Sequence, residues 1–190
     1  MRTTDKYVFF WKEHPFCNFT KCKIKFANPY YVADGDDPFY FSSSEQMFMW
    51  FKAMFFFDTE TAEKILKTSD PEEARRLGRE VKGYDDKKWN DVRVHYMKTA
   101  VSAKFIQNKE LRDKLIDPKY DGKQFVEASP YDRIWGIGCD QDSALKLDNY
   151  KNWGRNELGK ILNEVREKCI NLKEVLDDLG LVPKINVGEV

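Results

Sequence analysis

The stretch Ser42–Phe57, with the sequence SSSEQMFMWFKAMFFF, predicts a helix that is apolar on almost every side and therefore largely buried. Within it, Glu45 and Lys52 lie seven residues apart. Because a helix turns about 100° per residue, these two side chains return to within about 20° of one direction and share a face. An acid and an amine on a buried helix are costly unless they are paired, hydrogen-bonded or line a cleft. The stretch therefore marks a candidate cleft for chemistry.

The composition is that of a single soluble globular domain without a strong overall electrostatic field. The chain has 190 residues, with 32 Lys and Arg against 32 Asp and Glu, so its net charge is zero. The net charge therefore does not attract the chain to nucleic acid or to a membrane, and a nucleic-acid partner would need a local basic patch. Aromatic residues make up 15% of the chain, a high share that serves a core but also serves stacking on bases.

Metal-binding and targeting signals are absent from the sequence pattern. Four cysteines form no C-x-x-C pair, and the two histidines, His14 and His95, are far apart, so zinc-site spacing is missing. We therefore expect no metal and no cofactor. The N-terminus lacks the apolar region of a secretion signal, and no apolar run is long enough to span a membrane. We expect reduced thiols, a cytoplasmic location and no membrane partner.

The pattern of predicted elements is rich in helix. Strands are predicted over residues 6–11, 22–26, 30–32, 39–41 and 124–128. Further helices are predicted over residues 58–68, 70–81, 85–107, 109–116, 156–170 and 172–179. This order predicts an α+β fold, a helix-rich single domain with a small, mainly antiparallel sheet built from the first forty residues. We place the domain at residues 1–170, followed by a C-terminal helical extension and tail over 171–190.

Each candidate motif also has a plain structural interpretation. Ser42 or Ser44 can cap the helix, and Ser42-x-x-Glu45 fits a capping box, which would occupy Glu45. Lys52 can extend its head group into water. On pattern alone the structural interpretation of this pair is favoured.

Three later stretches carry the same ambiguity. Lys87-Lys88-Trp89 opens the long helix after a run of basic residues, which suits a polyanion but is also typical of a solvated face. The loop Glu127–Gly138 places carboxylates in a Pro- and Gly-framed loop after a strand, where Asp132 is either functional or a turn residue. Asn156 can cap the last long helix, and its structural interpretation is sufficient.

Taken in order, these fragments resemble the NADAR family, also known as YbiA-like proteins, over about residues 8–170. The matching fragments are Phe16–Phe19, Ser44–Gln46 with Lys52–Ala53, Ala74–Arg75, Gly78–Arg79, Trp89, Ala103–Phe105, Glu127 with Asp132, Trp135–Gly136, Trp153–Gly154, Asn156–Gly159 and Val165–Arg166. The chain departs from the family where Gln46 replaces a His of some members and Cys17 a Ser of many.

The resemblance implies an N-glycoside hydrolase that removes ADP-ribose from ADP-ribosylated guanine bases in nucleic acid. Carried over by position, the catalytic residues are Glu45, Lys52 and Asp132. The substrate-binding residues that it implies are Trp89, Asn18, Phe19, Gln46, Arg79, Trp135, Gly136 and Asn156. It also implies ADP-ribosylated nucleic acid as partner, with an ADP-ribosyltransferase toxin as a possible counterpart. Two alternatives stay open: an N-glycosidase for phosphoribosylamino-pyrimidine intermediates of riboflavin biosynthesis, and a non-catalytic module that binds ADP-ribose or NAD.

The chemistry of such a bond suits these residue types. Breaking an N-glycosidic bond leaves positive charge on the anomeric carbon, and the leaving amine needs a proton. Glu45 and Asp132 can divide the two roles if their environments separate their pKa values. Lys52 either pairs with Glu45 or, as a neutral amine, forms a Schiff base with the ring-opened sugar. Trp89 would stack on a base or sugar, and the basic residues before it would neutralise the pyrophosphate.

Overall fold

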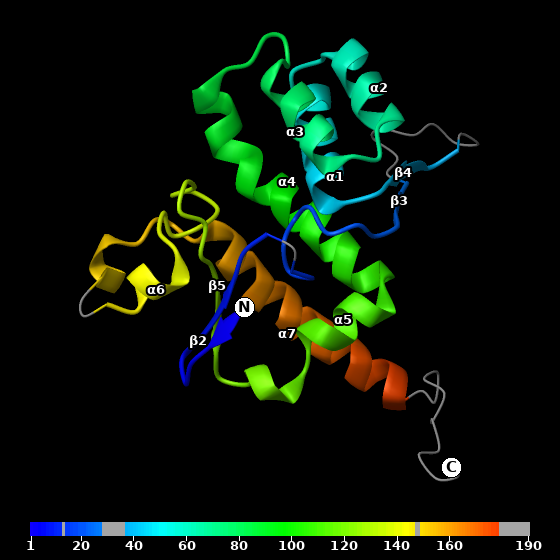
Figure 1. The fold of residues 1–190 in the computed structure, drawn as a ribbon. Helices are drawn as coiled ribbons and strands as arrows, with labels where there is room; N and C mark the ends of the chain where they lie inside the picture. The colour runs from blue at the N-terminus through cyan, green and yellow to red at the C-terminus, as the bar shows by residue number, and fades with distance from the viewer. Residues whose placement is uncertain (13, 28–36, 147–148, 179–190) are drawn as a thin grey trace.

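A computed structural model describes residues 1–12, 14–27, 37–146 and 149–178, and the upper part of Figure 1 is a group of helices around one buried helix. This helix, α1 (Ser44–Phe55), packs against three others: α2 (Thr59–Lys67), α3 (Pro71–Arg79) and α4 (Asp86–Gln107). Trp50, Phe51 and Met47 of α1 are almost fully buried. The apolar stretch therefore forms the core of the helical part, because only burial on all sides removes so many aromatic rings from water.

The start of α1 differs from the predicted cap by one residue. Ser43 is the N-cap, and its hydroxyl accepts a hydrogen bond from the backbone N–H of Gln46 at 3.1 Å. The Gln46 side chain, three residues after the cap, accepts from the backbone N–H of Ser42 at 2.6 Å. The glutamine thus takes the position that a capping box gives to its acid, and the carboxyl group of Glu45 is left for other contacts.

The strands form two small sheets. In the first, β1 (Arg2–Thr3) pairs antiparallel with β2 (Tyr7–Phe10), and β2 pairs parallel with β5 (Gln124–Glu127). In the second, β3 (Ile24–Phe26) and β4 (Phe39–Phe41) are antiparallel. The α+β, helix-rich class is confirmed, but the first forty residues divide between two sheets. Parallel pairing is possible because a long helical crossover connects β2 to β5. The predicted strand over 30–32 lies outside the described residues.

The C-terminal half supplies the last strand of the first sheet, β5, and the long helix α7 (Glu157–Asp178) that packs against it. It also contains α5 (Lys109–Leu115) and the short helices η1 (Pro118–Tyr120), α6 (Gln141–Ala144) and η2 (Asn149–Asn152). We predicted two helices over 156–179, but one continuous helix is present as far as residue 178. No Gly or Pro lies between residues 160 and 178, and Asn171 alone does not end a helix.

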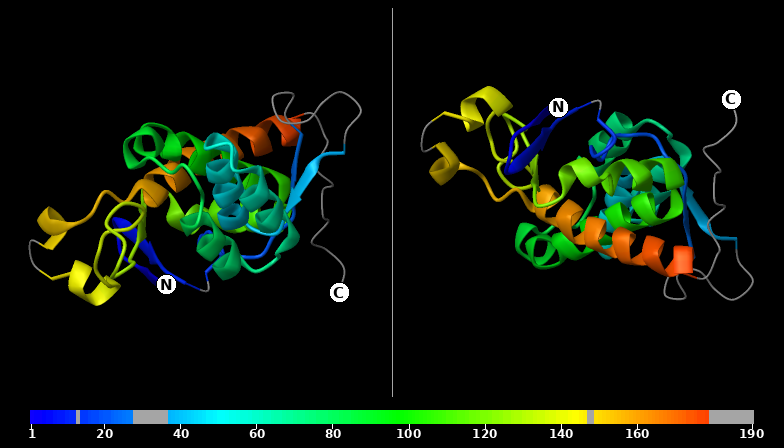
Figure 2. Two further views of the ribbon diagram at one scale, coloured as in Figure 1. Left: turned by 90° about the horizontal axis from the view of Figure 1, so that it is seen from above. Right: turned by 90° about the horizontal axis from the view of Figure 1, so that it is seen from below.

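Two apolar clusters hold these parts together. The larger surrounds α1 and reaches α4, α7 and β5. The smaller lies between the first sheet and the loops on its other side, where Phe9 and Val126 meet Ile137 and Ala144. Figure 2 shows α6 and its loops at one end of the molecule, away from α1 and α3. Among the described residues, no helix combines the length and apolarity that a membrane span requires.

Candidate active site

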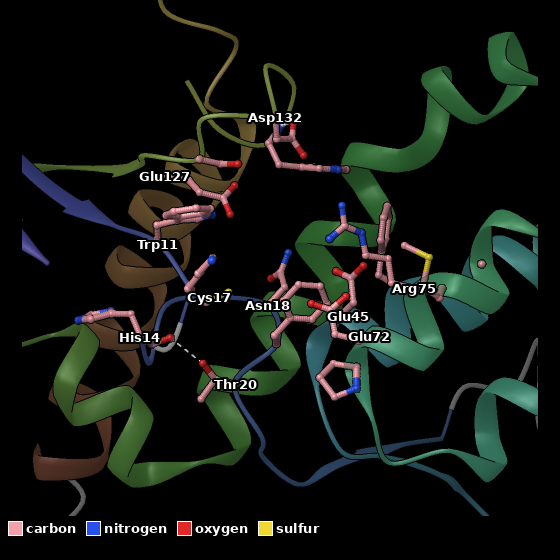
Figure 3. Close-up of a pocket in the computed structure, with 18 of the residues that line it drawn as sticks. Trp11, His14, Cys17, Asn18, Thr20, Glu45, Glu72, Arg75, Glu127 and Asp132 are labelled. Atoms are coloured by element: carbon pink, nitrogen blue, oxygen red, sulfur yellow. Dashed lines mark hydrogen bonds between the residues drawn. The ribbon is translucent and has the colours of Figure 1, made fainter. Parts of the chain in front are cut away.

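A cavity of about 980 Å³ lies where the helical part meets the loop after β5. Its walls come from residues within 11–12 and 14–20, from α1, α3 and α5, and from the segment 127–135. Figure 3 shows Glu127 and Asp132 on one side, Glu45 and Arg75 on the other, and Asn18 between them. Seven of the site residues named from the sequence line this cavity: Asn18, Phe19, Glu45, Lys52, Arg79, Asp132 and Trp135.

Glu45 brings a buried acid to the cavity. It is the second residue of α1, its side chain is 8% exposed, and its backbone N–H donates to the carbonyl oxygen of Asn18 at 3.2 Å. Its carboxyl group accepts no hydrogen bond from any residue that the structure describes. Burial raises the pKa of Glu45 to about 7, with Arg75 opposing the shift and Glu72 and Asp132 adding to it. Glu45 therefore changes charge near neutral pH.

Glu127, at the C-terminal end of β5, is a second acid that the sequence analysis quoted but did not select. Its Oε2 is buried without a hydrogen-bond partner. Burial raises the pKa of Glu127 to about 8, and the negative charges of Asp132 and Glu45 add to the shift. The available signal was its place at a strand end before a Pro- and Gly-framed loop, a common location for functional groups.

Asp132 is a turn residue that also lines the cavity. Its Oδ1 accepts from the backbone N–H groups of Ile134 at 2.7 Å and Trp135 at 2.8 Å, which is the geometry of a turn-forming aspartate. The same residue lines the cavity and raises the pKa of both glutamates. The turn therefore holds a negative charge beside the two buried acids.

Lys52 lines the cavity but does not pair with Glu45 in the structure, so the first of the two alternatives for it is not observed. Its Nζ donates to the carbonyl oxygen of Gly78 at 2.7 Å and lies 4.1 Å from the centroid of the Tyr84 ring. Seven residues bring two side chains to one face, but they separate them by about 10 Å along the axis. Burial lowers the pKa of Lys52, and the charge of Arg79 lowers it further.

The basic run on α3 splits into paired and unpaired charges. Arg76 binds Glu73 and Glu80 and is neutralised on the surface. Arg75 and Arg79 line the cavity and form no ion pair with any described residue. The Arg75 guanidinium lies 5.7 Å from the centroid of the Phe19 ring. Two arginines therefore present free positive charge to the cavity, which suits an anionic ligand.

Two of the predicted substrate-binding residues are used by the fold instead. The side-chain amide of Gln46 donates to the carbonyl oxygens of Ile65 at 2.8 Å and Thr68 at 2.6 Å, and so ties α1 to the end of α2. Trp89 is 5% exposed and stacks on Tyr96 at 5.7 Å between ring centroids. Neither residue lines the cavity, because each is buried within the helical core.

Gly136 and Asn156 also lie outside the cavity and position Glu127. A Cβ atom at Gly136 would lie 2.7 Å from the carbonyl oxygen of Glu127, so only glycine allows this approach. The Asn156 side chain accepts from the backbone N–H of Glu127 at 3.0 Å and donates to the carbonyl oxygen of Phe125 at 2.9 Å. Both residues therefore fix the end of β5, and the predicted direct contact with substrate is not supported.

The rim of the cavity carries aromatic rings and a histidine that the sequence did not single out as site residues. Trp11 and Tyr131 lie 6.3 Å apart between ring centroids, and Tyr131 is 88% exposed. Burial lowers the pKa of His14 to about 4, so this imidazole is neutral at neutral pH. Exposed rings at a cavity mouth suit stacking on a planar ligand.

Together these groups form a cavity with two acids of near-neutral pKa, two free arginines and an aromatic rim. Such a set can donate one proton, accept another and hold an anion. No group of three or more His, Cys, Asp or Glu side chains within the described residues is arranged to hold a metal ion.

Comparison with known proteins gives consistent matches. The model of the NADAR domain matches residues 9–169. The Caenorhabditis elegans protein irg-1 is 39% identical over 70% of this chain and 63% of its own length. An N-glycosidase of Acanthamoeba polyphaga mimivirus is 32% identical over 87% of this chain and 97% of its own length.

Two further similarities concern a longer protein and a solved structure. A riboflavin biosynthesis protein of Vibrio vulnificus is 35% identical over 70% of this chain, but the match spans only 34% of that protein. The NMR structure of the Escherichia coli protein YbiA superposes with a TM-score of 0.65 and 28% identity, over 92% of this chain and 90% of that one.

Proposed function

The chain belongs to the NADAR family, and on that basis we propose that it is an N-glycosidase that removes ADP-ribose from ADP-ribosylated guanine in nucleic acid. One observation carries the proposal: two buried carboxyl groups, Glu45 and Glu127, line one cavity with pKa values of about 7 and about 8. Acids whose pKa values lie near the working pH are suited to move protons in both directions.

The two acids divide the work of hydrolysis. Glu127, neutral below pH 8, protonates the leaving nitrogen as the bond between that nitrogen and the anomeric carbon breaks. Glu45, ionised above pH 7, faces the positive charge on the anomeric carbon and takes a proton from the attacking water. Water adds its oxygen to the anomeric carbon, so the products are free ADP-ribose and the restored base.

We assign the acid role to Glu127 rather than to Asp132. The Oδ1 of Asp132 already accepts two backbone hydrogen bonds, whereas the buried Oε2 of Glu127 has no partner. Asp132 acts on the acid through its charge, since it raises the pKa of Glu127 and so keeps that group protonated.

The rest of the cavity suits ADP-ribose. Arg75 and Arg79 place free guanidinium groups where they can bind the pyrophosphate, as forked donors do best. Trp11, Tyr131 and Trp135 offer rings for stacking, in place of the buried Trp89. The cavity volume of about 980 Å³ is at the upper end of the range for small-ligand sites, which fits a dinucleotide-sized group.

The test is to incubate the protein with an ADP-ribosylated oligonucleotide and to detect released ADP-ribose by mass spectrometry. We expect release by the parent protein, and strong loss in Glu45→Gln and Glu127→Gln. Glu110→Gln is the matched control, because Glu110 is exposed on α5 and does not line the cavity. Normal turnover by both site variants would exclude the two-acid reaction.

A second candidate substrate is a phosphoribosylamino-pyrimidine intermediate of riboflavin biosynthesis. The observation that favours it is the relative named a riboflavin biosynthesis protein. The same acids would cleave this N-glycosidic bond, so the two candidates differ in substrate and not in chemistry. Turnover of the small intermediate without release from the oligonucleotide would reverse the order of the two proposals.

A non-catalytic module that binds ADP-ribose or NAD is the remaining alternative. If this alternative holds, the Glu45→Gln variant binds ADP-ribose with the affinity of the parent protein. The parent protein then hydrolyses neither substrate. The cytoplasmic location and the toxin counterpart stay predictions.

The Schiff-base role of Lys52 is tested by borohydride trapping with substrate, followed by mass spectrometry. Burial lowers the pKa of Lys52, which favours the neutral amine that this route needs. An adduct at Lys52 supports the covalent route, whereas no adduct together with full activity of Lys52→Arg removes it.

A further inference from the structure

A second cavity, of about 540 Å³, adjoins the loop that carries Asp132. Asp132 and Trp135 line the first cavity, whereas the residues between them line the second. The lining comes from one face of α4, from this loop and from the segment before α7, and consists of Asp86, Asn90, Arg93, Arg133, Ile134, Trp153, Gly154 and Arg155. Three of these eight residues are arginines, in a chain whose net charge is zero.

Two residues that line this cavity carry a buried donor without an acceptor. Arg93 Nε and Trp153 Nε1 are both shielded from solvent, and neither has a hydrogen-bond partner in the described structure. Buried N–H groups are nearly always paired in folded proteins, because an unpaired one has lost its hydration without replacement. Two such donors on residues that line one cavity therefore favour a ligand that accepts hydrogen bonds.

Three arginines and one acid line the cavity, so its lining keeps a net positive charge. The guanidinium groups of Arg93 and Arg155 form no ion pair or hydrogen bond with any residue that the structure describes. Arg133 donates to the carbonyl oxygen of Asn152 at 2.7 Å, a neutral partner. The one acid, Asp86, already accepts from the Tyr84 hydroxyl at 2.8 Å and from the Asn90 amide at 2.7 Å.

A ligand for this cavity must carry several acceptor oxygens and negative charge. A phosphodiester has both, and guanidinium groups bind its oxygens as paired donors. Asp132 and Arg133 are consecutive residues with Cα atoms about 3.8 Å apart, so ligands of the two cavities would be near neighbours. If one base of a nucleic-acid strand lies in the first cavity, a phosphate of the strand's backbone would lie near the second cavity.

We propose that the second cavity binds a backbone phosphate of a single-stranded nucleic acid whose modified base enters the first cavity. This proposal rests on the proposed function, because it assigns part of the same substrate to a separate subsite. It commits to a polynucleotide, since Arg75 and Arg79 already face the first cavity and can serve the pyrophosphate of ADP-ribose there.

The first experiment compares two substrates, an ADP-ribosylated oligonucleotide and ADP-ribosylated guanosine, which has no phosphodiester backbone. Arg155→Gln is the main variant, because its exposed side chain has no hydrogen bond or ion pair with the described residues to lose. We expect the ratio of kcat/KM for the oligonucleotide to kcat/KM for the nucleoside to fall about tenfold. The ratio should stay at the parent value in Lys168→Gln, which removes an exposed charge on α7 outside the cavity. An unchanged ratio in Arg155→Gln and Arg93→Gln overturns the proposal.

The second experiment measures binding without catalysis. The affinity for an unmodified single-stranded oligonucleotide falls with salt, and the slope of log K against log [salt] should become shallower by about 0.7 in Arg155→Gln. A shallower slope without any release of ADP-ribose would keep the subsite and reject the proposed function. If ADP-ribose is released but the salt slope of Arg155→Gln and of Arg93→Gln equals that of the parent, the proposed function is kept and the subsite is rejected. If Arg155→Gln loses affinity for inorganic phosphate but keeps the parent slope, the cavity holds free phosphate and the strand proposal fails.

Discussion

The two cavities on either side of the Asp132 loop differ in which buried atoms lack a hydrogen-bond partner. In the first, Glu127 presents a buried acceptor atom without a donor, and burial raises the pKa of both glutamates. In the second, Arg93 and Trp153 present buried donors without an acceptor. The two cavities therefore differ in their unpaired buried groups, although the composition balances charge at 32 against 32. Net charge alone describes neither site, because local burial decides what each charged group can do.

The largest expected effect comes from removing the acid of the first cavity. Glu127→Gln should lower kcat for release of ADP-ribose by about 10²–10⁴-fold, the usual contribution of a general acid. For the parent, kcat/KM should rise as Glu45 ionises near pH 7 and fall as Glu127 ionises near pH 8. The variant should lose the fall at high pH. A parent profile that is flat between pH 6 and 9 would contradict this assignment.

The same substitution should stabilise the protein at high pH. The pKa of Glu127 is about 8 in the folded protein against an ordinary value of 4.5, so ionisation costs folding stability progressively as the pH rises between these values. Each pKa unit corresponds to about 1.4 kcal/mol, so we expect a gain of about 2–4 kcal/mol in the free energy of unfolding of Glu127→Gln at pH 8.5. Urea unfolding at pH 8.5 and pH 4.5 measures this, and an equal gain at both pH values would exclude a charge effect.

Loss of the Asn156 side chain should destabilise the strand end that carries Glu127. Asn156→Ala leaves the backbone groups of Glu127 and Phe125 without their partners, at a cost of about 1–3 kcal/mol. Urea unfolding measures the loss, and kcat should fall with it because the acid is no longer held in place. Full activity in the folded variant would show that Glu127 is positioned without this contact.

The smallest expected effect concerns the second cavity. Inorganic phosphate at about its dissociation constant should stabilise the parent by about 0.4 kcal/mol, from preferential binding to the folded state. Arg155→Gln should lose this gain, whereas Glu127→Gln should keep it, because the two residues belong to different cavities. Thermal unfolding at several phosphate concentrations measures the difference. Loss of the gain in Glu127→Gln instead would place the phosphate in the first cavity.

The sequence by itself determined the helical frame. Asp70-Pro71 predicts the start of α3, and Asp85 predicts that of α4, because caps and helical periodicity involve residues only a few positions apart. The apolar stretch of α1 likewise predicted its own burial. Seven of the site residues that the motifs indicated, Asp132 among them, line one cavity.

Only the tertiary structure decided which groups meet and how they are charged. The parallel pairing of β2 with β5 places Glu127, and that pairing spans more than a hundred residues. Lys52 meets Gly78 of α3 and not Glu45 of its own helix. Hydrogen bonds within a helix are local, whereas strand pairing, burial and the resulting pKa shifts depend on atoms that are distant in the chain. For that reason the acid at the end of β5 and the arginines of the second cavity emerged only from the folded molecule.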